Sequence, residues 1–152
     1  MRLTSLSGMN CSIARTLDVV GEWWTMLIIR DALRGATRFD QFRESLGVAR
    51  GVLSTRLHKL VEQGILDRRQ YSERPPRYEY PLTDKGRALA PVITALMTWG
   101  DTWASTPQGP PVLLVHEQCG QAIHPVQTCP HCHDEIDNGT LRSIPGPGKA
   151  SK

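Results

Sequence analysis

The chain has 152 residues, of which 39% are hydrophobic and 22% are charged, a balance typical of globular proteins and not of disordered ones. No apolar run approaches the roughly 18 residues of a membrane span, and residues 1–10 lack the apolar core of a signal peptide, so we expect a cytoplasmic protein with no membrane partner. The net charge of +3 says little about partners, but residues 50–77 hold seven basic and three acidic side chains, whereas residues 116–137 hold four acids and no Lys or Arg.

Three helices are predicted before residue 47. Ser12 is suited to cap a short helix that extends to about Val20. Residues 22–33 favour a buried helix, with Trp23 on its wide apolar face. Residues 40–46 form a third, short helix, which ends at a glycine turn.

The segment from Arg50 to Gln63 predicts an amphipathic helix. Leu53, Leu57 and Leu60 recur at i, i+4 and i+7, and small polar or basic residues occupy the opposite face. Two short helices joined by a glycine turn, with a polar outer face on the second, are typical of a helix-turn-helix.

After this helix the hydrophobic period changes. Residues 65–71 and 77–82 favour strands, and residues 72–76, which contain two consecutive prolines, favour the turn between them. The result is a hairpin with a basic tip. Thr83 then caps a long helix that ends near Trp103 and is kinked at Pro91.

The central basic segment points to duplex DNA. A helix held by one apolar face can enter the major groove, and a basic hairpin tip can contact the neighbouring minor groove or its backbone. Each element alone is equally compatible with a solvated helix face or an ordinary charged turn, but their succession favours DNA. We expect Arg50, Thr55 and His58 to reach base edges, and Arg56 and Lys59 to contact phosphates. The candidate DNA-binding residues are Arg50, Gly51, Ser54, Thr55, Arg56, His58 and Lys59 on the helix, and Arg74 and Arg77 on the hairpin.

A series of sequence segments supports this interpretation. They are Cys11, LDVVGEWW at 17–24, LIIRDAL at 27–33, RFDQFRESL at 38–46, LSTRLHKLVEQGIL at 53–66, PPRYEYPLTDKGRAL at 75–89 and WGDTW ending at 103. In this order the chain resembles the HxlR-type family of winged helix-turn-helix regulators, in the MarR-like winged-helix superfamily. One departure is Glu22, where the family often has a basic residue before the tryptophan.

The resemblance implies a mainly α (α+β) fold, with a two-stranded wing and a long C-terminal dimerisation helix. It also implies a homodimeric, sequence-specific transcription regulator, either a repressor or an activator, on a pseudo-palindromic operator. The sequence contains no GxSxG motif and no phosphate-binding glycine loop, so we do not expect an enzyme. The domain boundaries we expect are 11–105 for the DNA-binding and dimerisation domain, 106–111 for a linker, 112–137 for a small hairpin module and 138–152 for a disordered tail.

Cys11 has two interpretations. A thiol near a helix N-terminus can gain thiolate character, and the resemblance implies that a cysteine in this region can sense oxidants or electrophiles. The alternative is a small, partly buried apolar side chain at the edge of a dimer.

The C-terminal cysteines form a separate constellation. His116-x2-Cys119 and Cys129-x2-Cys132 offer four soft ligands for a tetrahedral structural zinc, in a module too small for a hydrophobic core. His124, His131 and His133 are competing ligands, and a Cys–Cys bridge or free thiols are the other possibilities. An alternative function follows from this module, a zinc-ribbon-type adaptor whose winged helix mainly serves docking or dimerisation.

Overall fold

A computed structural model describes residues 6, 8–104, 106–137 and 139–148. Contacts divide the chain into two units, residues 1–93 and residues 94–152, which are treated in turn. In the described part, no helix combines the length and apolar character needed to cross a membrane.

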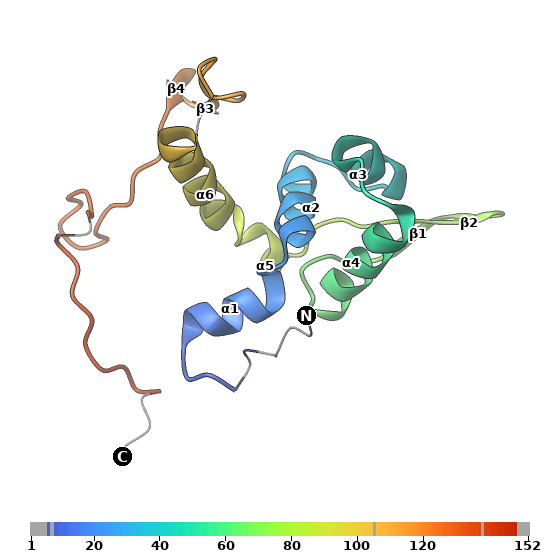
Figure 1. The fold of residues 1–152 in the computed structure, drawn as a ribbon, viewed down its shortest axis with the longest axis horizontal. Helices are drawn as coiled ribbons and strands as arrows, with labels where there is room; N and C mark the ends of the chain where they lie inside the picture. The colour runs from blue at the N-terminus through green and yellow to red at the C-terminus, as the bar shows by residue number, and fades with distance from the viewer. Residues whose placement is uncertain (1–5, 7, 105, 138, 149–152) are drawn as a thin grey trace. The chain divides into compact units, whose positions relative to one another are not determined.

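The first unit is a helix-turn-helix followed by a hairpin, as predicted (Figure 1). Gly47 forms the turn between the third and fourth helices in the left-handed conformation (φ 60°), which favours glycine. Its N–H donates to the Arg43 carbonyl at 2.9 Å, which closes the end of the third helix. The elements are α1 Ser12–Val20, α2 Trp23–Leu33, α3 Phe39–Leu46, α4 Arg50–Glu62, β1 Arg69–Glu73, β2 Pro76–Glu79, α5 Asp84–Arg87 and the start of α6 Ala90–Trp103.

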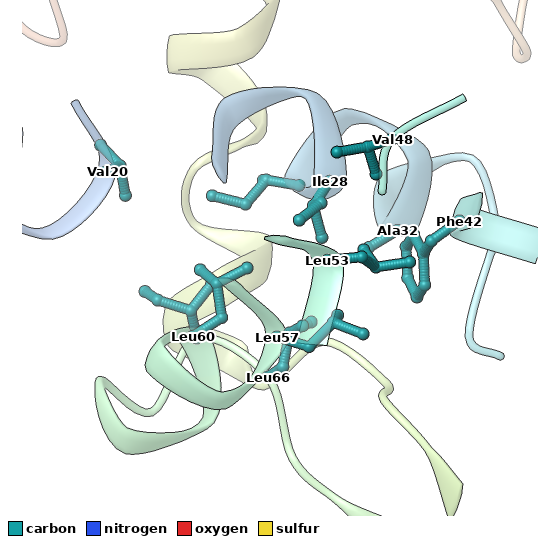
Figure 2. Close-up of a cluster of buried hydrophobic side chains, with 11 residues drawn as sticks. Val20, Ile28, Ala32, Phe42, Val48, Leu53, Leu57, Leu60 and Leu66 are labelled. Atoms are coloured by element: carbon teal, nitrogen blue, oxygen red, sulfur yellow. The ribbon is translucent and has the colours of Figure 1, made fainter. Parts of the chain in front are cut away.

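The core lies between α2, α3 and α4. Figure 2 shows Ile28, Phe42 and Leu53 among the buried side chains that meet there, and all three are fully buried. Leu57 and Leu60 complete the predicted apolar face of α4. Burying a leucine side chain contributes about 1.5–3 kcal/mol, so three of them fix α4 to the core and leave its opposite face to solvent.

The two strands of the hairpin begin and end at different residues from those predicted. β1 and β2 pair in antiparallel register, with Arg69 opposite Glu79 and an irregularity between Gln70 and Ser72. Ile65 and Leu66, which the sequence placed in the first strand, are buried in the core, and of the two only Leu66 pairs with the second segment, through an isolated antiparallel bridge to Leu82. The apolar pair Ile65 and Leu66 lies just before the polar residues of β1, so the sequence alone did not separate core residues from the exposed ribbon.

The long helix predicted from Thr83 to Trp103 is wrong in one respect, because it is broken into α5 and α6. Thr83 caps α5 as predicted, since its Oγ1 accepts a hydrogen bond from the Gly86 N–H at 3.1 Å. Pro91 cannot donate to the carbonyl four residues earlier, and its ring clashes there. The chain therefore leaves the helical path at residues 88–89 and begins again at Ala90.

Trp23 does not lie on the buried face of α2, as the sequence suggested. Its side chain is 85% exposed, whereas Ile28, Ile29 and Ala32 are buried. At 100° per residue, Trp23 lies more than 100° around the helix from both isoleucines. The apolar stretch is thus wider than the face that the core covers.

The second unit contains the rest of α6 and a small hairpin. Trp99 and Trp103 of α6 are 62% and 75% exposed. β3 Leu114–His116 and β4 Gln121–Ile123 pair antiparallel, and an isolated bridge joins Thr128 and Glu135. None of the described residues from 106 to 148 is buried. Of the tail predicted as disordered, residues 139–148 contain no helix or strand, and residues 138 and 149–152 lie outside the described part.

Candidate nucleic-acid interface

The outer face of α4 is the centre of the candidate interface. Six of the seven candidates on this helix are exposed, on the side away from the buried leucines. At Gly51 a Cβ atom would meet nothing within 4 Å, so this part of the helix surface is open to close approach. The exposed candidates are Arg50, Gly51, Ser54, Thr55, His58 and Lys59.

Intramolecular contacts orient three of these side chains. The Arg50 guanidinium lies over the Phe39 ring, 5.2 Å from its centroid, and links the start of α4 to α3. The Thr55 hydroxyl donates to the Gly51 carbonyl at 2.9 Å, which leaves its oxygen able to accept a hydrogen bond. His58 Nε2 lies 3.2 Å from Glu62 Oε1, one turn further along the same helix.

Arg56 has a different environment from the other candidates on α4. Its guanidinium donates to Glu22 Oε1 at 2.5 Å, and the two side chains are 20% and 29% exposed. Both line a cavity of about 480 Å³ that Thr25 and Lys59 also line. The sequence suggested a phosphate contact for Arg56, whereas in the structure its side chain is partly buried and paired with Glu22 at the N-terminus of α2. The unusual acid at position 22 therefore has a basic partner.

The hairpin carries the second part of the interface. Arg74 and Arg77 are exposed and have no acidic partner within the described residues. At the base of the hairpin the Arg69 side chain and the Arg68 backbone N–H donate to Asp67, and these hydrogen bonds hold the pKa of its carboxyl below the ordinary value. Arg69 is thus engaged by an acid and less available to an external phosphate.

Contacts with the segment that leads into α3 fix the root of the hairpin. The Tyr80 N–H donates to the Thr37 carbonyl at 2.6 Å, and Arg38 forms an isolated antiparallel bridge with Glu79. The Arg38 guanidinium lies over the Tyr71 ring, 4.7 Å from its centroid.

Sequence reasoning missed two basic residues at this edge, Arg38 and Arg68. Arg68 lies over the Tyr78 ring at 3.6 Å, so both arginines stack on aromatic side chains of the hairpin strands. The tyrosines at 71 and 78 were a signal that such partners exist, but Arg38 is far from Tyr71 in the sequence.

Cys11 lies at the N-terminal boundary of α1. It occupies the N-cap position that the sequence assigned to Ser12, and its side chain makes no capping hydrogen bond. Ser12 is the first helical residue, and its Oγ accepts a hydrogen bond from Arg15 Nη2 at 3.0 Å. The Cys11 thiol is partly buried and not disulfide-bonded.

The four predicted zinc ligands form two separate pairs. His116 Nδ1 lies 3.3 Å from Cys119 Sγ. At Cys129, hydrogen bonds from the backbone N–H groups of Cys132 and His131 and from the Cys132 thiol lower the pKa of the thiol. Among the described residues, no three His, Cys, Asp or Glu side chains come together in a group that could hold a metal ion.

Known proteins are similar to this chain over most of its length. Residues 19–108 match the profile of a family described as HxlR-like helix-turn-helix. An uncharacterised HTH-type transcriptional regulator of Mycobacterium tuberculosis (strain ATCC 25618 / H37Rv) is 46% identical over 141 residues, which cover 93% of this chain and 89% of the relative. An uncharacterised HTH-type transcriptional regulator of Synechocystis is 36% identical over 98 residues, covering 64% of this chain and 73% of that protein.

Two solved structures are similar over different lengths. PA1607, described as a candidate transcription factor, is 39% identical with a TM-score of 0.83, and the match covers 93% of this chain and 99% of that chain. The redox regulator HypR in its reduced form is 32% identical with a TM-score of 0.58, over 60% of this chain and 92% of that chain. The similarity to PA1607 therefore extends beyond the helix-turn-helix.

Proposed function

Because the chain belongs to the HxlR-like helix-turn-helix family of transcription regulators, we propose that it binds a pseudo-palindromic operator as a homodimer, with α4 of each copy in the major groove. The chain is a DNA-binding regulator and not an enzyme. The observation that carries the proposal is the division of α4 between a face of buried leucines and an exposed face of small, polar and basic side chains.

The exposed side chains take different roles in this proposal. Arg50, Thr55 and His58 present hydrogen-bonding groups to base edges. Arg50 can bind a guanine through two parallel hydrogen bonds. Lys59 at the C-terminal half of α4 contacts phosphate. Arg74, at the tip of the hairpin, contacts the neighbouring minor groove of the DNA or its phosphate backbone.

The homodimer accounts for apolar side chains that the single chain leaves in water. Ile13 and Leu17 on α1 are exposed, as are Leu96, Trp99 and Trp103 on α6. Large apolar side chains gathered on one element mark interaction surfaces. A second copy of the same chain, related by a two-fold axis, would cover exposed apolar side chains of this kind and present two α4 helices to one duplex.

Binding is tested with the DNA upstream of the protein's own gene, in a fluorescence anisotropy titration at several salt concentrations. We expect affinity to fall steeply with salt, because each phosphate contact releases counterions. An affinity that does not depend on salt, or no binding to this and neighbouring upstream regions, would overturn the proposed mode.

The oligomeric state is measured by light scattering after size exclusion. We expect twice the 16.9 kDa of one chain, and we expect Trp99→Glu to give the single-chain mass. Leu141→Glu is the matched control, because Leu141 is equally exposed but lies outside α1 and α6. A wild-type protein of single-chain mass at micromolar concentration would exclude the dimer.

A redox signal at Cys11 is a second part of the proposal. Its support is the position of the thiol at the N-terminus of α1, next to the proposed dimer surface, together with the similarity to HypR, which is described as a redox regulator. We expect diamide to release wild-type protein from DNA, and Cys11→Ser to remain bound. Equal release of both proteins would assign Cys11 a packing role only.

A further inference from the structure

The two turns that carry the tail cysteines have the same backbone geometry. In the first turn the Gly120 N–H donates to the His116 carbonyl at 2.8 Å, and Gly120 has φ 68°. In the second the His133 N–H donates to the Cys129 carbonyl at 2.9 Å, and His133 has φ 64°. His133 is the one non-glycine residue with positive φ in the described part of the chain. Two unrelated segments thus place a pair of soft ligands three residues apart and close the turn in the same way.

Each turn already brings its two ligand atoms together. His116 Nδ1 and Cys119 Sγ lie 3.3 Å apart, and the Cys129 and Cys132 thiols are hydrogen-bonded to each other. Tetrahedral zinc, with Zn–N near 2.0–2.1 Å and Zn–S near 2.3 Å, separates a nitrogen and a sulfur ligand by about 3.5 Å. The first pair therefore has nearly the spacing of one edge of a zinc tetrahedron.

The tail has no apolar core of its own to explain these turns. None of the described residues from 106 to 148 is buried, and β3 and β4 pair over only three residues each. A two-stranded hairpin of this size is at best marginally stable in water. Small modules that lack a core usually obtain their stability from disulfides or a metal, and the four cysteines are free thiols.

We propose that His116, Cys119, Cys129 and Cys132 together bind one Zn²⁺ ion as a structural site. The three thiols bind as thiolates and release their protons to solvent, and His116 binds through the unprotonated Nδ1. All four positions of the ion are filled by protein, so the site is closed to substrates. The proposal does not depend on the proposed function, because none of these residues belongs to the DNA-binding surface.

Binding one ion requires the two turns to approach each other, since the structure does not gather three of the ligands. Residues 124–126, which connect β4 to the second turn, are all exposed. The second turn is closed by its own hydrogen bonds, from Ile136 N to the Gln127 carbonyl and from Cys129 N to the Asp134 carbonyl. It can therefore move as a unit without breaking buried contacts, which keeps the cost of closing the site small.

The test uses the full chain, purified under reducing conditions and loaded with zinc alone. Elemental analysis counts the metal, and cobalt substitution reports on thiolate ligands through charge-transfer absorption. We expect about one zinc per chain in the wild type and in two controls, Cys11→Ser, a cysteine outside the set, and His124→Ala, a tail histidine outside the set. Cys119→Ser and Cys129→Ser should weaken zinc binding by more than the 10–100-fold typical of lost outer-shell partners.

A variant that exchanges one ligand for another separates coordination from folding. His116→Cys keeps four ligands, so it should retain zinc and show stronger cobalt charge-transfer absorption than the wild type. Three results would each overturn the proposal: a wild-type chain without zinc whose mass shows a Cys129–Cys132 disulfide, zinc that persists in both serine variants, and zinc that is lost in His124→Ala.

Discussion

Arg56 provides a quantitative test of how α4 contacts DNA. If Arg56 contacted a phosphate, Arg56→Ala would reduce the slope of log K against log salt by about 0.9. In the structure its guanidinium is only 20% exposed and is bound to Glu22. We therefore expect Arg56→Ala to leave the salt slope unchanged, whereas Lys59→Ala, on the exposed side of the same helix, should reduce it by about 0.9.

The effects of the two variants on stability should be the reverse of their effects on the salt slope: Arg56→Ala should lower Tm clearly, and Lys59→Ala should hardly change it. Removing Arg56 leaves the partly buried Glu22 carboxylate without its partner, and one Glu22 oxygen, Oε2, is already buried without a hydrogen bond. The loss lies between that of an exposed ion pair and that of a buried one, about 1–3 kcal/mol. For a domain of this size, 1 kcal/mol lowers Tm by about 4–8 °C. Lys59→Ala should change Tm by no more than about 2–4 °C, since exposed substitutions usually cost no more than about 0.5 kcal/mol.

The assay combines anisotropy titrations at four salt concentrations with thermal unfolding of the same preparations. A double-mutant cycle with Glu22→Ala isolates the interaction, because the second substitution should cost little once the first has been made. The reasoning is refuted if Arg56→Ala lowers the salt slope by about one unit and leaves Tm unchanged. That result would return Arg56 to the phosphate-binding role suggested by the sequence.

Three further predictions concern the core and the interface. Leu57→Ala should lower the free energy of unfolding by about 2–5 kcal/mol in urea titrations, because Leu57 is fully buried; a loss below 1 kcal/mol would show that α4 is loosely packed. Gly86→Ala should destabilise by at least about 1–3 kcal/mol, since its Cβ would lie 2.2 Å from the Ile65 carbonyl oxygen, and an unchanged Tm would mean that α5 moves freely. Arg50→Ala should reduce discrimination between operator and a one-base variant by about 1–3 kcal/mol, whereas Arg74→Ala should weaken binding to both sequences equally; the reverse pattern in competition titrations would exchange the two roles.

The fold was predictable where one local pattern determines one outcome. The leucine spacing on α4 specified its buried face, and Thr83 specified the start of α5, because both signals act within a few residues. The strand limits were not predictable in the same way, since Ile65 and Leu66 are adjacent apolar residues that belong to the core while the strand itself begins at Arg69. Pro91 indicated a distortion, but its size depends on how the two helical segments pack.

The candidate site was predictable to a similar extent. The polar face of α4 and the basic hairpin tip follow from residue type and order. The pairing of Glu22 with Arg56 joins residues 34 positions apart, and only the packing of α2 against α4 brings them together. The stacking of Arg38 on Tyr71 is also set by tertiary structure, so sequence reasoning could name an excess of positive charge but not which charges are already engaged.

The attachment of the hairpin root to the start of the helix-turn-helix has a consequence for affinity. The bond from Tyr80 N to the Thr37 carbonyl ties the base of the hairpin to the segment that leads into α3, the helix before α4. Hairpin and helix are therefore two tethered binding modules, and once α4 is seated the hairpin meets the duplex at high effective concentration. A rigid tether spares most of the entropy that a free arm would lose on binding, so a few weak contacts at Arg74 and Arg77 can add substantially to residence time on DNA.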